Sequence, residues 1–139
     1  PIMGVMRMET LRQTRRHLPY ADSDRVLLAE MGLRGRFELL PEALFGRRMH
    51  SGQTTQKYAD RWERTLVFDP EMRGRAIVPW LRQIGDLLSA VRRAPLTRND
   101  RWNCYKAIWW WTRAHRRQVV EDVRRGVSVS TRRFVSATS

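Results

Sequence analysis

The segment from Pro79 to Arg93 constrains the fold of this chain more than any other. Its apolar side chains recur at the i, i+3/i+4 and i+7 spacing that lines one face of an α-helix. We therefore expect a helix over residues 79–93 whose apolar face forms core. That face consists of Trp80, Leu81, Ile84, Leu87, Leu88 and Val91.

Helical periodicity, interrupted by proline and glycine, continues through most of the chain. It predicts an all-α fold, a small and irregular helical domain. Further helices are expected over residues 6–17, 24–31 and 41–45, around residues 58–66, and over a long Trp-rich stretch from 99 to 125 that Gly126 ends. The expected divisions are a basic N-terminal helix or extension (1–17), the helical domain (18–126) and an extended basic tail (127–139).

Arginine dominates the charge of the chain. Of its 27 basic residues all but Lys57 and Lys106 are arginine, and 14 acidic residues leave a formal net charge of +13. Guanidinium groups bind phosphate oxygens bidentately. GC-rich coding would also favour arginine, but it should raise glycine, which occurs only 8 times. The arginines occur in nearly every segment, which suits a protein lodged in a folded RNA and its protein neighbours.

Three consecutive tryptophans, Trp109, Trp110 and Trp111, cannot all face one core, because successive helical residues are about 100° apart. A helical wheel predicts that Trp111 projects away from the domain and contacts a partner. The side expected to pack on the domain holds Trp102, Tyr105, Ile108, Trp109, Val119, Val120 and Val123.

A neighbouring stripe of the same helix is basic, with Trp110 inside it. We interpret it as a groove that follows an RNA backbone while Trp110 stacks on a base or ribose. The alternative is a solvated charged face whose indole packs on arginine stems. The expected RNA-binding residues are Lys106, Trp110, Arg113, Arg117 and Arg124, together with Arg47, Arg48, Arg132 and Arg133.

No pattern in the sequence indicates catalysis, a cofactor or a metal site. There is no Gly-rich phosphate loop, no His-x-x-x-His spacing and only one cysteine, Cys104. No apolar run is long enough to span a membrane. Residues 2–17 are basic with a single acid, which is typical of a mitochondrial targeting segment, although an ordinary basic helix reads the same way. We expect a non-enzymatic protein of the mitochondrial matrix.

Two short motifs resemble the mitochondrial small-subunit ribosomal proteins of family thirty-three. They are Leu44-Phe45-Gly46 and the run Leu81-Arg82-Gln83-Ile84-Gly85, and the resemblance covers about residues 26–90. It implies a structural ribosomal protein without enzymatic activity. The chain departs from the family at Arg47, where the family tends to place Glu, in a shorter stretch between the motifs, and in its Trp-rich C-terminal region.

The sequence thus predicts a structural component of a mitochondrial ribosome that binds ribosomal RNA and ribosomal proteins within a multi-subunit assembly. The alternative is an accessory subunit of a mitochondrial inner-membrane respiratory complex, in which the arginines and indoles would meet acidic subunits or lipid headgroups. A small DNA-binding protein is disfavoured, because the segment 79–93 is too apolar to serve as a recognition helix.

Overall fold

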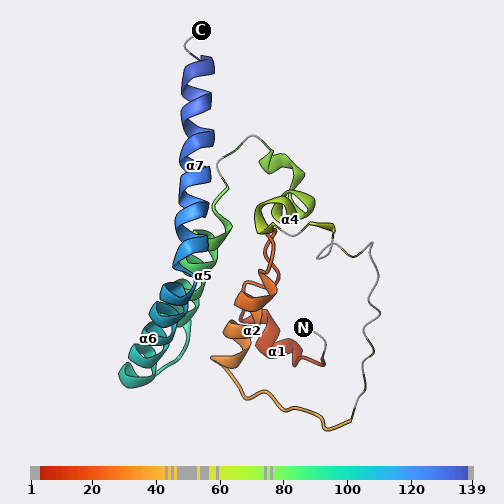
Figure 1. Ribbon diagram of the computed structural model, residues 1–139. Coiled ribbons are helices and arrows are strands. Elements are labelled where there is room, and N and C mark those ends of the chain that lie inside the picture. The colour runs from red at the N-terminus through yellow and green to blue at the C-terminus, as the bar shows by residue number, and fades with distance from the viewer. Residues whose placement is uncertain are drawn as a thin grey trace.

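The computed structural model describes residues 4–42, 44, 46, 53, 57–58, 60–73, 75 and 77–137, with side chains as far as residue 128. Within these residues the protein is all-α, as the sequence predicts, and contains no strand (Figure 1). The elements are α1 (Met8–Arg12), α2 (Asp24–Gly32), α4 (Arg61–Phe68), the 3-10 helix η1 (Pro70–Met72), α5 (Pro79–Arg93), α6 (Arg98–Ala114) and α7 (Arg116–Ala137).

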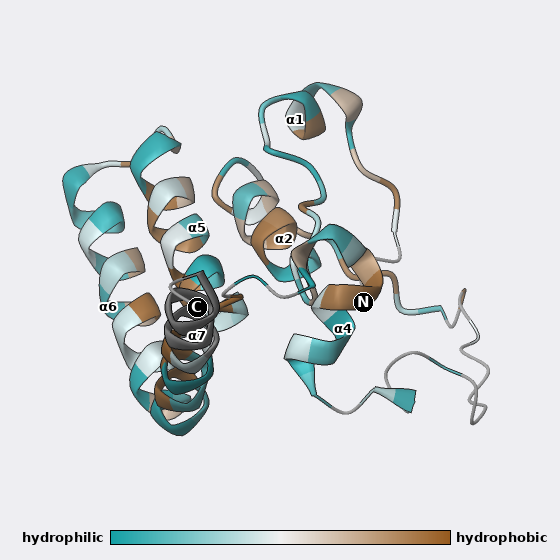
Figure 2. Cartoon of the chain, turned by 90° about the horizontal axis from the view of Figure 1, so that it is seen from above, coloured by the Kyte–Doolittle hydropathy of each residue, from teal (hydrophilic) through white to brown (hydrophobic). Residues whose placement is uncertain are grey.

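Helix α5 is the centre of the fold, and its bounds are those predicted from the apolar spacing. It contacts α2, α4, α6 and α7. Figure 2 shows α5, α6 and α7 grouped on one side of the molecule and α1, α2 and α4 on the other. In Figure 1, α6 and α7 follow one another in the same general direction, opposite to α5.

The buried face of α5 differs in part from the predicted one. Pro79, Gln83, Ala90 and Val91 are buried, whereas Leu81 and Leu88 are each 40% exposed. Small side chains allow neighbouring helices to approach closely, and the Gln83 amide is satisfied by the Arg61 guanidinium at 2.7 Å. The predicted stripe is therefore only partly core.

The start of α5 is capped by a residue of another helix. Val78, its N-cap residue, offers no side-chain hydrogen bond. Instead the buried carboxylate of Asp122 in α7 accepts hydrogen bonds from the backbone N–H groups of Trp80 (2.9 Å) and Leu81 (3.4 Å). These amides have no partner inside their own helix, so α7 supplies the acceptor that the local sequence lacks.

Gly126 lies one turn after Asp122, at the crossing of α7 and the segment before α5. A Cβ atom built there would lie 2.7 Å from Cγ1 of Val78. Glycine at this position therefore permits the close approach of the two segments.

Two predictions for the C-terminal region are wrong. The expected helix over residues 99–125 is broken at His115, and Gly126 does not end it, because α7 continues through Gly126 to Ala137. The expected extended tail is thus helical as far as residue 137. A glycine inside a helix costs only about 1 kcal/mol relative to alanine, and no proline follows it.

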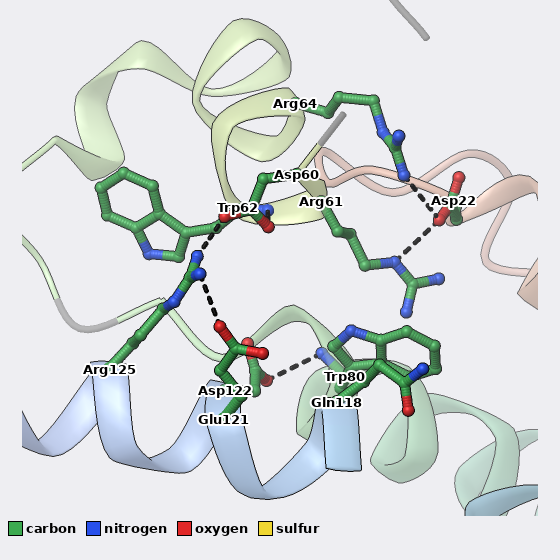
Figure 3. A pocket seen from close by; sticks show the side chains of 10 residues that line it. All are labelled: Asp22, Asp60, Arg61, Trp62, Arg64, Trp80, Gln118, Glu121, Asp122 and Arg125. Atoms are coloured by element: carbon green, nitrogen blue, oxygen red, sulfur yellow. Dashed lines mark hydrogen bonds and ion pairs between the residues drawn. The ribbon is translucent and has the colours of Figure 1, made fainter. Parts of the chain in front are cut away.

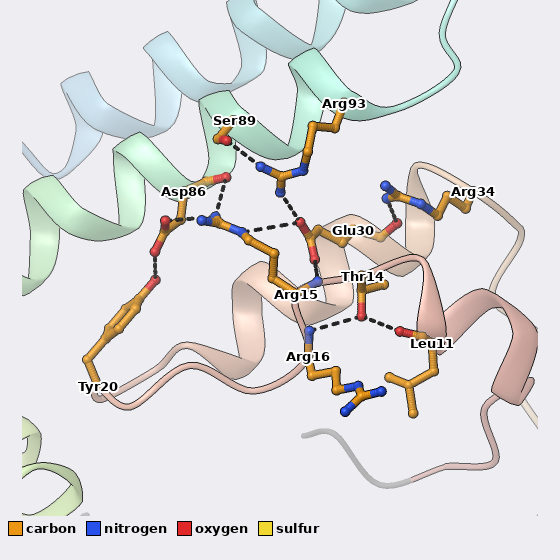
Figure 4. A network of polar contacts seen from close by, with 10 residues as sticks. All are labelled: Leu11, Thr14, Arg15, Arg16, Tyr20, Glu30, Arg34, Asp86, Ser89 and Arg93. Carbon is orange, nitrogen blue, oxygen red and sulfur yellow. Dashed lines mark hydrogen bonds and ion pairs between the residues drawn. The ribbon is translucent and has the colours of Figure 1, made fainter.

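A network of ion pairs joins α2, α5 and the segment after α1 around the fully buried Glu30 (Figure 4). The Glu30 carboxylate accepts a hydrogen bond from the backbone N–H of Arg15 (2.7 Å) and pairs with the guanidinium groups of Arg15 (3.7 Å) and Arg93. Arg15 also pairs with Asp86 at 2.7 Å, and the Tyr20 hydroxyl donates to the same carboxylate at 2.7 Å. Arg15, within the expected N-terminal extension, is therefore bound to the helical body.

The shorter predicted helices have mixed outcomes. The helix predicted over residues 24–31 is confirmed as α2, and that around residues 58–66 as α4. The helix predicted over 6–17 ends at Arg12, because the Thr14 hydroxyl bonds to the Leu11 carbonyl and to the Arg16 backbone N–H in a local turn. The helix predicted over 41–45 is absent at positions 41, 42 and 44, and positions 43 and 45 lie outside the described residues.

Candidate nucleic-acid interface

The orientation of α6 is set by a stripe of half-buried side chains that faces the rest of the protein. Trp111 belongs to this stripe: its ring lies 5.5 Å from that of Trp80 in α5 and 4.7 Å from that of His115. His115 also hydrogen-bonds the Trp111 carbonyl through Nδ1 at 2.8 Å. The expectation that Trp111 projects away from the domain is therefore wrong, because Trp80 and His115 cover its ring.

The two tryptophans before Trp111 point outward. Trp109 is 55% exposed, Trp110 is 62% exposed, and their rings meet edge-to-face at 4.7 Å. Trp102, two turns before Trp109, is 63% exposed. The prediction that Trp102 and Trp109 pack on the domain is therefore wrong, and Val120 and Val123 are exposed as well. The break at His115 and the stacking partner Trp80 set the phase of the helix, and neither is visible in the local pattern.

Cations alternate with the exposed indoles along the outer surface of α6. Trp102, Lys106, Trp109 and Arg113 follow one another at i, i+4, i+7 and i+11, which places them in one row. The Arg113 guanidinium lies 5.7 Å from the centroid of the Trp109 ring, at cation–π distance. The surface we call the indole–arginine face consists of Trp102, Lys106, Trp109, Trp110, Arg113, Arg116 and Arg117.

A shallow groove on this face crosses the break between α6 and α7. It has a volume of about 280 Å³. Its lining contains two guanidinium groups and one indole but no carboxylate, so an anion would meet no like charge there. The lining residues are Trp109, Thr112, Arg113, Arg116, Val119 and Val120.

The cations of the indole–arginine face are not paired with carboxylates. Lys106, Arg113, Arg116 and Arg117 make no ion pair with any acidic residue in the described part of the chain. The ion pairs lie instead around α2, α4 and the inner side of α7, where Arg15, Arg61, Arg64, Arg93 and Arg125 meet Asp22, Glu30, Asp60, Asp86 and Glu121. Unpaired positive charge therefore lies beside the exposed indoles, although other exposed arginines such as Arg25, Arg92 and Arg98 also have no ion pair among the described residues.

The structure brings several predicted RNA-binding residues together. Lys106, Trp110, Arg113 and Arg117 are exposed on α6 and the start of α7, and Arg124 is exposed further along α7. Arg132 and Arg133 lie on the helical backbone of α7, beyond the last described side chain. Arg47 and Arg48 lie outside the described residues.

Trp102, Trp109 and Arg116 belong to the face although the sequence did not predict them. The spacing of Trp102, Lys106, Trp109 and Arg113 was the signal that could have found the two tryptophans.

Two other kinds of site are absent from the described residues. No group of three or more His, Cys, Asp or Glu side chains is placed there to hold a metal ion. None of the described helices combines the length and the apolar character that crossing a membrane requires.

Comparisons with protein-family models, curated protein sequences and solved structures find no match for this chain.

Proposed function

We propose that this protein binds single-stranded RNA through the indole–arginine face and acts as a non-enzymatic structural component of a ribonucleoprotein. The observation that carries the proposal is a set of cations, without ion pairs to the described carboxylates, interleaved with three exposed indoles on α6 and the start of α7. Cations attract the phosphates, and indoles stack on bases without regard to sequence.

Single-stranded RNA fits this face better than a duplex. Bases in a duplex are already stacked on one another and are not open to an indole, whereas bases in loops and single strands can splay out onto aromatic rings. Trp102 and Trp109 are seven residues apart, which is about 10 Å along a helix. Consecutive indoles along the row could therefore hold different bases of one strand.

The ribosome, and the mitochondrial small subunit in particular, is the finer assignment that we propose. It is supported by the dispersal of arginine over the whole chain and by the resemblance of its two short motifs to ribosomal proteins of family thirty-three. A protein of this charge is expected to need RNA or protein neighbours to offset its self-repulsion.

The indoles and arginines of the same face would also suit a position beside lipid headgroups, as in an accessory subunit of a respiratory complex. The two proposals are separated by what releases the protein from its native assembly. Nuclease treatment of a native extract should release a ribosomal component from the ribosomal subunits with which it sediments. A subunit of a membrane complex would stay in the membrane fraction.

The direct test measures binding of the purified protein to fluorescently labelled single-stranded RNA, duplex RNA and anionic vesicles over a salt series. We expect preference for the single strand and affinity that falls steeply with salt. Trp110→Ala should weaken binding by about tenfold, since a stacked base contributes about 1–3 kcal/mol. Arg113→Ala should reduce the salt slope by about 0.7.

Arg92→Ala is the matched control, because Arg92 is an exposed arginine on α5, outside the indole–arginine face. Equal effects of Arg92→Ala and Arg113→Ala would mean that charge alone drives binding and would contradict the proposed interface. Binding to vesicles but not to RNA would favour the membrane-complex alternative.

A further inference from the structure

A second, chemically different site lies between α4 and α7, beside the start of α5 (Figure 3). It is a cleft of about 230 Å³. A water molecule occupies about 30 Å³ of the liquid, so the cleft is several waters in size but smaller than the usual pocket for a drug-sized ligand. Its lining holds two indoles, four carboxylates, three guanidinium groups and an amide: Trp62, Trp80, Asp22, Asp60, Glu121, Asp122, Arg61, Arg64, Arg125 and Gln118.

Arg61 of α4 is the residue that points to a ligand. Its side chain is only 5% exposed and reaches into the cleft, where its guanidinium lies 4.2 Å from the centroid of the Trp80 ring (Figure 3). Nε donates to Asp22 at 2.8 Å and Nη2 donates to the Gln83 amide oxygen at 2.7 Å. Nη1 is buried and has no hydrogen-bond partner among the described residues. An unpaired buried donor is costly, so the site lacks one acceptor.

The other charges of the cleft exclude two classes of ligand. Arg125 pairs with Asp60 and with Glu121 (2.7 Å), and Arg64 pairs with Asp22 at 3.4 Å. A phosphate would therefore meet four carboxylates, while two of the three cations of the cleft, Arg64 and Arg125, are already paired. A metal ion is disfavoured because the described carboxylates do not form a group that could hold one.

The class of ligand that remains is an uncharged ring that carries an acceptor for Arg61 and donors for the carboxylates. We propose that this cleft binds a nucleobase with an exocyclic carbonyl, and guanine best among them. Guanine joins its O6 acceptor, the usual partner of arginine, to the N1–H and N2–H donors that carboxylates accept. Adenine has no carbonyl and presents an amino group to the arginine instead.

This inference rests on the proposed function, because the base in the cleft would belong to a nucleotide splayed out of the bound RNA. The recognition chemistry is the same for a free nucleoside, which carries no phosphate and so does not need the indole–arginine face. Free nucleosides therefore test the cleft separately from RNA binding.

The experiment titrates the full-length protein with guanosine, inosine and adenosine by isothermal calorimetry. Two-dimensional NMR follows the indole N–H signals of Trp62 and Trp80. Guanosine should bind most tightly and adenosine about tenfold more weakly or worse, because adenosine carries an amino donor where guanosine offers the O6 acceptor to the charged Arg61 donor. Inosine, which lacks only the 2-amino group, should fall between them. An RNA oligonucleotide with a single unpaired guanine then shows whether the base can come from RNA.

Two variants and two controls make the result decisive. Arg61→Lys removes the forked donor and should abolish the preference for guanosine. If this variant fails to fold, Gln118→Phe fills the cleft from an exposed position on α7 and should abolish guanosine binding. Glu63→Gln, an exposed change on α4 outside the cleft, should leave guanosine binding unchanged. Trp110→Ala, on the indole–arginine face, should leave guanosine binding in the cleft unchanged as well.

Equal binding of guanosine and adenosine, no binding of any nucleoside, or full guanosine binding by Gln118→Phe would overturn the proposal. A protein that binds guanosine in the cleft but does not bind single-stranded RNA would keep this site and overturn the proposed function. A protein that binds single-stranded RNA but no guanosine would keep the proposed function and overturn this site.

Discussion

The carboxylate of Asp122 in α7 accepts a hydrogen bond of 2.9 Å from the backbone N–H of Trp80, forty-two residues earlier in the chain. The bond joins the last helix to the first turn of the central helix. The ring of the same Trp80 also packs against the ring of Trp111 and against the Arg61 guanidinium. Trp80 is therefore the residue at which α4, α5, α6 and α7 meet.

Replacing Asp122 should destabilise the fold by removing the cap of α5. Asp122→Ala should lower the free energy of unfolding by about 1–2 kcal/mol, the usual range for loss of an N-cap acceptor. Asp122→Asn should cost less, because it keeps an acceptor and because burial already raises the pKa of Asp122, which disfavours its charge. Urea unfolding followed by circular dichroism measures both. Glu121→Ala at the exposed neighbouring position is the control, and an equal loss there would contradict the capping role.

Adding a methyl group at Gly126 should be harmful although alanine is the better helix former. The new Cβ would lie 2.7 Å from Cγ1 of Val78, a side chain with little rotamer freedom. We expect Gly126→Ala to cost about 1–3 kcal/mol of unfolding free energy through overpacking. Gly85→Ala is the matched control, because Gly85 lies in α5 and a methyl group there would have nothing within 4 Å. This second variant should gain up to about 1 kcal/mol.

The same unfolding measurements test the pairing of the two residues. Val78→Ala should recover part of the loss in the Gly126→Ala background, because it removes the atom that the new methyl group meets. If the loss is the same with and without Val78→Ala, the close approach of these segments is wrong.

The stability of the protein should fall at high pH through Tyr20. Burial raises the pKa of Tyr20, and the hydrogen bond that its hydroxyl donates to Asp86 raises it further. The unfolded phenol ionises near pH 10, so the folded state then holds a proton that the unfolded state has lost. This contribution is complete below about pH 10 and is lost as the pH rises from there towards the higher pKa of the folded state.

Unfolding free energies of the wild type and of Tyr20→Phe, measured below and above about pH 10, isolate the contribution of the Tyr20 hydroxyl. The phenylalanine variant should be less stable near neutral pH and should lose less stability on going alkaline. Parallel pH profiles for the two proteins would contradict the assignment.

Substitutions of the adjacent Trp110 and Trp111 should affect different properties, RNA binding for Trp110 and stability for Trp111. Trp111→Ala should lower the free energy of unfolding by roughly 2 kcal/mol, less than for a fully buried tryptophan, because its ring packs on Trp80 and His115. Trp110→Ala should change stability by less than about 1 kcal/mol but weaken RNA binding. Thermal unfolding and RNA titration of both variants check this, and a stable Trp111→Ala protein would show that the inward stripe of α6 is misplaced.

The all-α class and the bounds of α5 followed from local information. The spacing of apolar residues between Pro79 and Arg93 specifies an amphipathic helix, and proline at its first turn marks where the helix begins. The presence of an outward aromatic and basic surface on the Trp-rich helix also followed, because three consecutive indoles cannot share one side.

The identity of the outward indoles did not follow, because the phase of a helix depends on its neighbours. Trp111 faces inward since Trp80 stands opposite it, whereas the helical wheel alone assigns that place to Trp109. Gly126 gave the signal of a helix end, yet the structure uses it for close packing against Val78. A local pattern cannot distinguish these two uses of glycine.

By itself the sequence determined the helical class, the central helix and a net charge of +13, because each depends on residue types and their spacing along the chain. The tertiary structure decided which arginines are paired, which indoles are exposed and where Arg61 lies buried with one donor unsatisfied. Those properties depend on contacts between segments far apart in sequence, such as α4 with α5 and α5 with α7, and only the folded chain brings them together.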